Sequence, residues 1–233
     1  MAFRFKQFTI EDCHSTMQVG TDSILLGSLT DPGDAKRILD IGTGCGVLAL
    51  MMAQKSKAIV DAIELDDESV REANENFERS PWNTRLACFG ISLQLTEILT
   101  DNRYDLIISN PPFFKDSLRP PDPQRSLARH DLKLTFDELV KAVTTLISKD
   151  GRFSCIIPAN RWDEARKLAE NRQLYPRTLI QIYPYPGGKV TRMIVEFTKE
   201  KIEPVQTSDF TILNDERKYT AEYLEATKDF HYF

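Results

Sequence analysis

The sequence predicts an α/β fold in which helices cover both faces of a mostly parallel sheet. Segments with the spacing of helices alternate along the chain with short apolar runs that are typical of buried strands. A glycine-rich segment, Gly42 to Gly46, joins one of these runs to a helical pattern, as at the ligand-binding edge of open sheets. The length of 233 residues suits one such domain.

The first part of the chain contains four predicted strands, and each ends before a turn or a helix. They span residues 37–41, 58–64, 85–89 and 104–109. Helices are predicted at 23–29, directly after Gly46, and after Glu64, because apolar side chains recur there at helical spacing. The continuous apolar run in the fourth strand indicates that both of its faces are covered.

A helix with a clear start opens the second part of the chain. Thr135 and Glu138 have the spacing of a capping box, and apolar residues recur from there to Ile147. The turn Asp150-Gly151 precedes the fifth strand. The remaining elements, in order, are that strand at 152–157, a helix at 162–170, and strands at 179–183 and 190–197. The last two strands flank Pro186-Gly187-Gly188, which predicts a terminal antiparallel hairpin. Residues 115–131 are polar and predicted to form a loop, and the tail after Lys199 has no predicted element.

The composition excludes several classes of protein. Hydrophobic residues make up 41% and charged residues 28%, which is ordinary for a folded chain and disfavours wholesale disorder. No apolar run approaches the roughly 20 residues of a membrane span, and the N-terminus lacks a signal pattern, so a cytoplasmic protein without membrane association is expected. None of the four cysteines has metal-ligand spacing, so reduced thiols and no metal are expected.

The charge is unevenly distributed. A net charge of −5 disfavours a generic nucleic-acid binder. Residues 160–192 nevertheless carry seven basic and three acidic side chains, a local charge of +7 − 3 = +4. This segment is either an ordinary solvated surface or a patch that contacts phosphates.

The segment from Asp40 to Gly46 is the predicted cofactor turn. Glycines 42, 44 and 46 allow a ligand to approach the backbone closely at the start of a helix. An acid just before the glycines would repel a pyrophosphate, but it attracts the ammonium and sulfonium groups of S-adenosylmethionine. Glu64, at the end of the second strand, can accept hydrogen bonds from ribose hydroxyls. The candidate cofactor-binding residues are Asp40, Gly42, Thr43, Gly44, Gly46, Glu64, Leu65 and Asn110.

The fourth strand ends in Asn110-Pro111-Pro112-Phe113, the predicted acceptor turn and candidate catalytic residues. Parallel strands end at one edge of a sheet, so this turn is expected beside the cofactor turn. The Asn110 side-chain oxygen and the Pro111 carbonyl can accept both N–H bonds of an amino group on a planar ring, and two prolines hold these acceptors in place. Phe113 can stack on the ring. The pattern predicts methyl transfer to such a nitrogen.

Taken together, Asp40-x-Gly-x-Gly-x-Gly46, Glu64 and Asn110-Pro-Pro-Phe113 resemble the motifs of class I amino-methyltransferases. Further segments resemble the tRNA(Val) adenine-6-amino methyltransferase group over nearly the whole chain. They are Phe5-Lys-Gln-Phe8, Met17 to Asp22, Leu25-Leu26-Gly27 and Tyr219 to Phe230. This resemblance implies a Rossmann-like fold with a seven-stranded sheet, S-adenosylmethionine as cofactor, and methylation of the adenine next to the anticodon. It also implies that Val19 to Asp22 lies near the cofactor.

One departure from the family pattern concerns the adenine of the cofactor. Relatives often carry an acid after the third strand, but Cys88 to Ser92 contains none, so backbone atoms or Ser92 are left for that contact.

A division of the chain and a set of basic residues around the entrance to the site are expected as well. One methyltransferase domain is expected over 1–233, with an N-terminal lid at 1–36, a core at 37–199 and a tail packed on the core at 200–233. A monomer is expected. The candidate RNA-binding residues are Lys6, Lys115, Arg125, Arg129, His130 and Lys189.

Three alternative functions stay open at this stage. Ribosomal-RNA guanine-2-amino methyltransferases share the Asn-Pro-Pro-Phe form. Release-factor glutamine methyltransferases usually have Tyr after Asn-Pro-Pro and a separate N-terminal domain, for which about 35 residues are too few. A non-catalytic RNA-binding relative would have no need of Asp40, Glu64 and Asn110.

Overall fold

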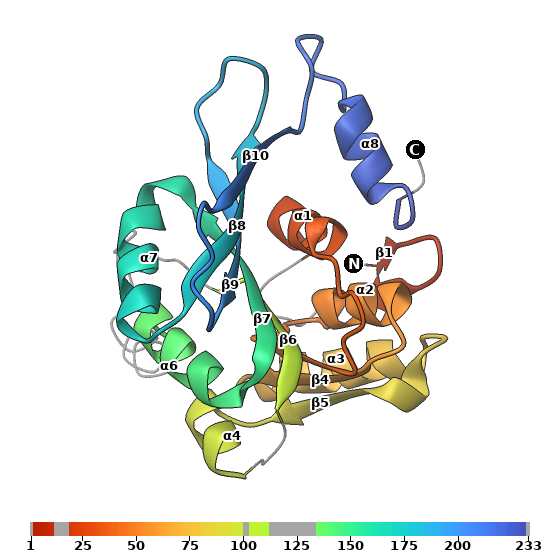
Figure 1. Cartoon of the computed structure of the whole chain (residues 1–233). Helices are drawn as coiled ribbons and strands as arrows, with labels where there is room; N and C mark the ends of the chain where they lie inside the picture. The colour runs from red at the N-terminus through yellow and green to blue at the C-terminus, as the bar shows by residue number, and fades with distance from the viewer. Residues whose placement is uncertain (1, 12–18, 100–102, 112–133, 232–233) are drawn as a thin grey trace, which may run out of the picture.

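The computed structural model describes residues 2–11, 19–99, 103–111 and 134–231. Figure 1 shows a twisted sheet with helices packed on both sides. The strands are β1 (Ala2–Arg4), β2 (Thr9–Glu11), β3 (Arg37–Ile41), β4 (Ile59–Glu64), β5 (Leu86–Gly90), β6 (Tyr104–Ser109), β7 (Ile147–Pro158), β8 (Tyr175–Tyr183), β9 (Arg192–Thr198) and β10 (Gln206–Thr211). The helices are α1 (Thr21–Leu29), α2 (Val47–Lys55), α3 (Asp67–Glu78), α4 (Leu93–Leu99), α6 (Phe136–Leu146), α7 (Trp162–Asn171) and α8 (Ala221–Thr227), with 3₁₀ turns at Asn83–Arg85 and Ala159–Arg161.

The main sheet has the strand order β10-β8-β9-β7-β6-β3-β4-β5. Within it, β9 pairs antiparallel with β7 and with β8, and the other pairings are parallel. The strands other than β9 therefore point the same way. We call the edge at which their carboxyl ends lie the carboxyl edge. Both predicted turns, after β3 and after β6, leave the sheet at this edge.

Alternation of side chains along the strands divides the core into two layers. Neighbouring residues such as Ile38 and Leu39, or Ile107 and Ile108, belong to different clusters of buried side chains. One cluster joins the sheet to α1, α2 and α3, and the other joins it to α6 and α7. The predicted mostly parallel sheet with helices on both faces and a terminal antiparallel hairpin is confirmed.

Within the described residues the main sheet has eight strands, one more than the seven expected. The additional strand is β10, in the tail for which no element was predicted. In β10 only Phe210 is buried, so its sequence lacks the alternation that marks a strand. The strand forms because it pairs in parallel with β8.

The strand predicted at 152–157 is longer in the structure. β7 begins at Ile147, which pairs with Tyr104 before the register shifts at Leu106 and Arg152. The predicted Asp150-Gly151 turn is therefore an irregularity within β7. Gly151 is required there, because a Cβ atom would lie 2.7 Å from the carbonyl oxygen of Tyr104.

The two chain ends lie side by side (Figure 1). The hairpin β1–β2 follows the N-terminus, and the Lys6 amide donates to the carbonyl of Phe230. Phe5 stacks on Phe8, and Phe230 is buried in the same cluster. Helix α8 contacts α1, so both terminal segments pack on the α1–α2 side of the sheet.

Candidate functional site

The glycine turn between β3 and α2 is held from the neighbouring strand. The amides of Gly42 and Thr43 both donate to the carbonyl of Ile63 in β4, at 2.9 and 3.2 Å. Gly42 has a φ of +71°, and a Cβ atom built on it would have no atom within 4 Å. The turn therefore presents open space next to its backbone, which a ligand can occupy.

Gly46 is required for a different reason. Its φ is +87°, and a Cβ atom there would lie 2.5 Å from the ring of Phe77. This contact sets how closely the start of α2 packs against α3. One glycine thus leaves space for a ligand, and the other lets two helices approach.

Asp40 lies beneath the glycine turn and is fully buried. One oxygen, Oδ2, accepts hydrogen bonds from the Thr43 hydroxyl (2.5 Å) and the Ala49 amide (3.1 Å). The other, Oδ1, is buried and has no hydrogen-bond partner among the described residues. Burial raises the pKa of Asp40 from 3.8 to about 7, although the Thr43 and Ala49 hydrogen bonds act in the opposite direction.

Glu64 closes the turn from the side of β4. Its Oε2 accepts from the Gly44 amide at 3.1 Å, and its Oε1 accepts from the amides of Leu65 and Asp66. A carboxylate has about four acceptor positions, so Glu64 keeps acceptor capacity for a further donor such as a ribose hydroxyl.

The acceptor turn is linked to β3 and to α1. Ser109 donates its hydroxyl to the carbonyl of Ile41 at 2.8 Å, which places the end of β6 beside the end of β3. The side-chain amide of Asn110 donates to the Ser23 hydroxyl at 3.1 Å. Pro111 is buried, while Pro112 and Phe113 lie outside the described residues.

Both turns line one pocket. Its lining includes Ser23, Gly42, Thr43, Gly44, Leu48 and Asn110. The chemistry of this turn suits a cationic ligand such as the amino-acid part of S-adenosylmethionine, because a Cβ atom on Gly42 would meet open space and a buried oxygen of Asp40 has no partner among the described residues. Asp40 does not line the pocket itself, so its charge acts from below the backbone.

Ser23 and the ion pair between Asp22 and Arg192 are features of this region that the sequence analysis missed. Asp22 is the last residue of the segment Val19 to Asp22, which was expected near the cofactor, and Ser23 follows it directly. The partners, however, are 87 and 170 residues away along the chain, and no local pattern indicates them.

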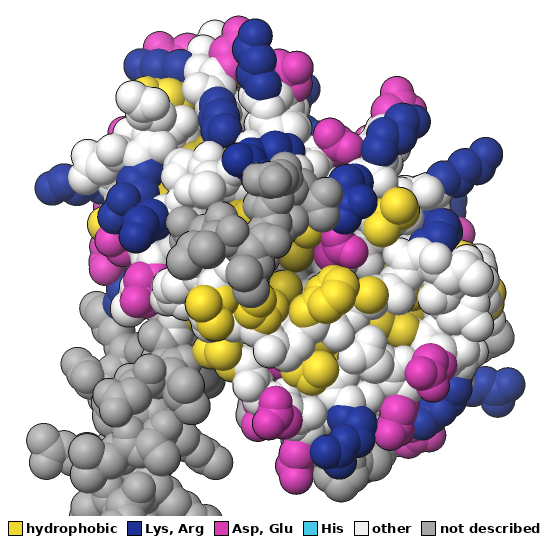
Figure 2. Space-filling view, turned by 90° about the horizontal axis from the view of Figure 1, so that it is seen from below, with side chains coloured by type: hydrophobic (Ala, Val, Ile, Leu, Met, Phe, Trp, Pro, Cys, Tyr) yellow, Lys and Arg dark blue, Asp and Glu magenta, His cyan; other side chains and the backbone are white. Residues whose placement is uncertain are grey.

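Large hydrophobic side chains are exposed near the ends of β4 and β5. Leu65, Phe89 and Leu95 are 43%, 49% and 50% exposed. Figure 2 shows a group of hydrophobic side chains on the face seen from below, the side on which α4 and β5 lie in Figure 1. Ser92 accepts a hydrogen bond from the Leu95 amide and thus caps α4.

Two of the RNA-binding candidates can be placed. Lys189 is exposed in the loop between β8 and β9, which lies at the carboxyl edge because β8 ends there. Lys6 donates its ammonium group to the carbonyl of Lys228, in the contact between the chain ends. Lys115, Arg125, Arg129 and His130 lie outside the described residues, as does the predicted loop at 115–131.

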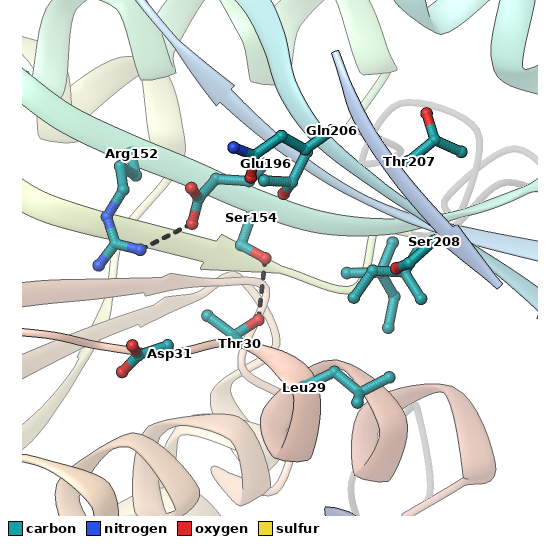
Figure 3. Close-up of a pocket in the computed structure, with 12 residues that line it drawn as sticks. Leu29, Thr30, Asp31, Arg152, Ser154, Glu196, Gln206, Thr207 and Ser208 are labelled. Carbon is teal, nitrogen blue, oxygen red and sulfur yellow. Dashed lines mark hydrogen bonds and ion pairs between the residues drawn. The ribbon is translucent and has the colours of Figure 1, made fainter. Parts of the chain in front are cut away.

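A separate and larger cavity, about 360 Å³, lies between the end of α1 and the strands β7, β8, β9 and β10. Figure 3 shows Arg152 paired with Glu196 and Ser154 bonded to Thr30 in its lining. These polar groups are partnered within the protein. The larger cavity shares no lining residue with the pocket at the glycine turn.

The described ranges include three of the four cysteines. Cys45, Cys88 and Cys155 are free and buried, and burial raises the pKa of Cys88 to about 12, so this thiol stays protonated. Within these ranges, no cluster of three metal-ligating side chains occurs, and none of the helices is long and apolar enough to cross a membrane.

Sequence comparisons identify relatives over nearly the full chain. The model of the methyltransferase small domain family matches residues 12–128. Proteins named tRNA1(Val) (adenine(37)-N6)-methyltransferase are 39% identical in Bacteroides fragilis and in Trichodesmium erythraeum, and each match covers 98% of this chain and 97% of the relative. A protein of that name in Flavobacterium johnsoniae is 37% identical, with 98% of both chains covered.

Solved structures agree on the fold. A "predicted O-methyltransferase" from Agrobacterium tumefaciens aligns with a TM-score of 0.69 at 17% identity, covering 90% of this chain and 96% of that one. A methyltransferase from Pyrococcus furiosus aligns with a TM-score of 0.60 at 20% identity, covering 84% and 90%. With a fold, a cofactor turn and full-length relatives in agreement, the chain belongs to the tRNA1(Val) (adenine(37)-N6)-methyltransferase family and is an S-adenosylmethionine-dependent methyltransferase.

Proposed function

We propose that this enzyme methylates the 6-amino group of an adenine in tRNA, at the base 3′ of the anticodon of tRNA(Val). The observation that carries the proposal is the position of Asn110, whose side chain lines the same pocket as Gly42 and Gly44. An amide oxygen next to the cofactor turn can hold an amino group where the methyl group is delivered. The names of the full-length relatives support adenine and tRNA as the substrate.

The cofactor contacts belong to the same proposal. Gly42, Thr43 and Gly44 would hold the amino-acid part of S-adenosylmethionine, the negative charge of Asp40 would attract its cationic groups, and Gly46 keeps the turn in place. Glu64 would accept a hydrogen bond from a ribose hydroxyl. Bound S-adenosylmethionine supplies an electrophilic methyl group on a sulfonium. Leu65 and Phe89 offer exposed apolar surface to the adenine ring of the cofactor, where the sequence has no acid.

The acceptor turn prepares the nucleophile. The lone pair of an adenine amino group is delocalised into the ring, so the amine is a poor nucleophile until it becomes pyramidal. In our proposal, the Asn110 side-chain oxygen and the Pro111 carbonyl accept its two N–H bonds and favour that geometry. Pro112 stiffens the turn, and Phe113 stacks on the base. No strong base is required, because the amine becomes acidic once it carries the methyl group.

The carboxyl edge also offers contacts for RNA near the site. The loop between β8 and β9 carries exposed Lys189 and Tyr185, and the Arg217 guanidinium lies 4.4 Å from the centre of the Tyr185 ring. The amides of Ile212 and Leu213, after β10, donate to the carbonyls of Tyr183 and Pro184. These bonds hold the loop after β10, which carries Arg217, against the loop between β8 and β9. A cation and an aromatic ring in fixed positions suit the phosphates and unpaired bases of an anticodon loop.

The remaining expectations belong to this proposal as well. Lys6, Lys115, Arg125, Arg129 and His130 are proposed to contact the tRNA, together with Lys189. The segment 1–36 is proposed as a lid on a single domain, because α1 supplies a side chain to the pocket. We also propose that the protein is a monomer, that it acts on tRNA in the cytoplasm, and that it uses no metal.

Mass spectrometry of tRNA nucleosides tests the assignment directly. A strain that lacks the gene should lose 6-methyladenosine from tRNA(Val), and the wild-type gene should restore it, whereas an Asn110→Ala gene should not. Loss of only methylguanosine from ribosomal RNA, or of only methylglutamine from release factors, would instead establish one of the alternative substrates and overturn the assignment to tRNA.

A further inference from the structure

The side-chain amide of Asn110 is held by a residue that no motif identifies. Its Nδ2 donates to the Ser23 hydroxyl at 3.1 Å, and the two residues are 87 positions apart. Ser23 is only 6% exposed and lines the pocket together with Asn110. The hydrogen bond therefore lies at the reacting end of the site rather than on the surface.

The two ends of an amide group are chemically different. The oxygen accepts hydrogen bonds and the nitrogen donates them. An incoming amino group presents N–H donors, so it can be held only by the oxygen end. An amide that turned by 180° would place its own N–H₂ group against the substrate N–H₂ and repel it.

We propose that Ser23 is the positioning residue that restrains the Asn110 amide, holding its nitrogen toward α1. In the structure the hydroxyl accepts an N–H from Nδ2, so the amide nitrogen faces α1 and the amide oxygen faces away from it. Because a serine hydroxyl can donate as well as accept, Ser23 restrains the amide in this position rather than excluding the turned form by itself. Ser23 itself does not touch the reacting atoms. This inference rests on the proposed function, in which Asn110 holds the target amine.

The first turn of α1 is fixed firmly enough for this task. Asp22 forms an ion pair with Arg192 of β9 at 2.8 Å, which holds the turn from the sheet. Ile24, Leu25 and Leu26 are buried in the core directly after it. The serine hydroxyl is therefore presented from a rigid element, as precise orientation of a catalytic group requires.

The matched variants are Ser23→Ala and Ser28→Ala. Both remove a hydroxyl from α1, but the buried Ser28 Oγ has no hydrogen-bond partner among the described residues. In Ser23→Ala we expect kcat for tRNA to fall about tenfold, the effect of losing one neutral hydrogen bond. The KM for tRNA and the Kd for S-adenosylmethionine should stay within about twofold, because only the amide orientation changes. Ser28→Ala should retain wild-type kcat.

A spectroscopic measurement separates orientation from general damage. In protein labelled with ¹⁵N at asparagine, the Nδ2 resonance of Asn110 is assigned by its loss in Asn110→Asp. That resonance should shift and its protons should exchange faster in Ser23→Ala, but not in Ser28→Ala. An unchanged resonance or an unchanged kcat in Ser23→Ala would overturn the proposal, as would an equal loss of kcat in Ser28→Ala.

The resonance also separates this inference from the proposed function. If the wild-type enzyme methylated no adenine in tRNA, the proposed function would fail. The contact between Ser23 and Asn110 would still be tested by the ¹⁵N measurement, which needs no substrate.

Discussion

The two halves of the site are built in different ways. The cofactor turn is stabilised mainly by its own chain segment and by the adjacent strand β4, through Asp40, Ile63 and Glu64. The side chain of the acceptor residue Asn110 is held by α1, and α1 is anchored to β9 by an ion pair across 170 residues. The cofactor half is therefore a local structure, and the acceptor half depends on the assembled fold.

The strongest test of this contrast is Asn110→Ala. Turnover should fall by about 10²–10³-fold, comparable to the loss of one essential polar group in an active site. Binding of S-adenosylmethionine should stay within about twofold, because the contacts proposed for the glycine turn and Glu64 are intact. Radiolabelled methyl transfer to tRNA and calorimetry measure the two quantities. Wild-type turnover in this variant would contradict the claim that Asn110 belongs to an acceptor half that is separate from the cofactor half.

Within the cofactor half, alanine at one glycine should mainly reduce folding stability, and alanine at the other should mainly reduce cofactor affinity. Gly46→Ala combines a φ of +87° with a Cβ atom 2.5 Å from Phe77, so it should cost about 3 kcal/mol of folding stability. Gly42→Ala meets no atom within 4 Å, so it should cost about 1 kcal/mol while its methyl group occupies ligand space.

Thermal melts and calorimetry should therefore separate the two variants. Cofactor affinity should fall more than about tenfold in Gly42→Ala, since its methyl group would occupy the space in which we propose that the cofactor binds. If Gly46→Ala melted like the wild type, the close contact between α2 and α3 would not limit stability.

The charge beneath the turn predicts a dependence on pH. With a pKa of about 7, Asp40 is mostly protonated at pH 6 and mostly ionised at pH 8. The Kd for S-adenosylmethionine should therefore be up to about tenfold lower at pH 8 than at pH 6. The Asp40→Asn variant should lack this change of Kd between pH 6 and pH 8. The amino group of the cofactor titrates equally with the wild type and with the variant, so it does not affect the comparison. A wild-type profile identical to that of Asp40→Asn would show that the charge does not contribute.

Folding stability should respond with the opposite sign. The folded state raises the pKa of Asp40 above 3.8, so it retains the proton that the unfolded chain releases. Relative to Asp40→Asn, the wild type should lose stability as pH rises from about 4 to about 7, with no further loss above that range. Urea melts at several pH values measure this difference.

The smallest effect is expected at a hydrogen bond outside both halves. Ser154→Ala removes the buried hydrogen bond to Thr30 in the larger cavity and should cost about 1 kcal/mol of stability. Cofactor affinity and kcat should not change, since this cavity shares no lining residue with the pocket at the glycine turn. A clear loss of kcat in a well-folded variant would connect the two cavities.

The sequence predicted the parts of the molecule that local interactions determine. Short local patterns predicted β3 and α2, which flank the cofactor turn, and the structure confirms both. They also predicted the capping box at Thr135, which is present. β10 was missed because it presents one buried residue and exists through pairing with β8. Ser23 was missed because its role depends on a partner brought close only by folding.

The contact between the chain ends bears on how the protein is made. Lys6 and Lys228 are bonded although 222 positions separate them, and Phe230 is buried beside the first hairpin. A ribosome delivers residue 230 long after residue 6 has emerged. The hairpin β1–β2 therefore stays without this partner until residue 230 has been synthesised. Premature termination before Phe230 would leave the apolar side chains of Phe5 and Phe8 without this cover and favour aggregation of the truncated product.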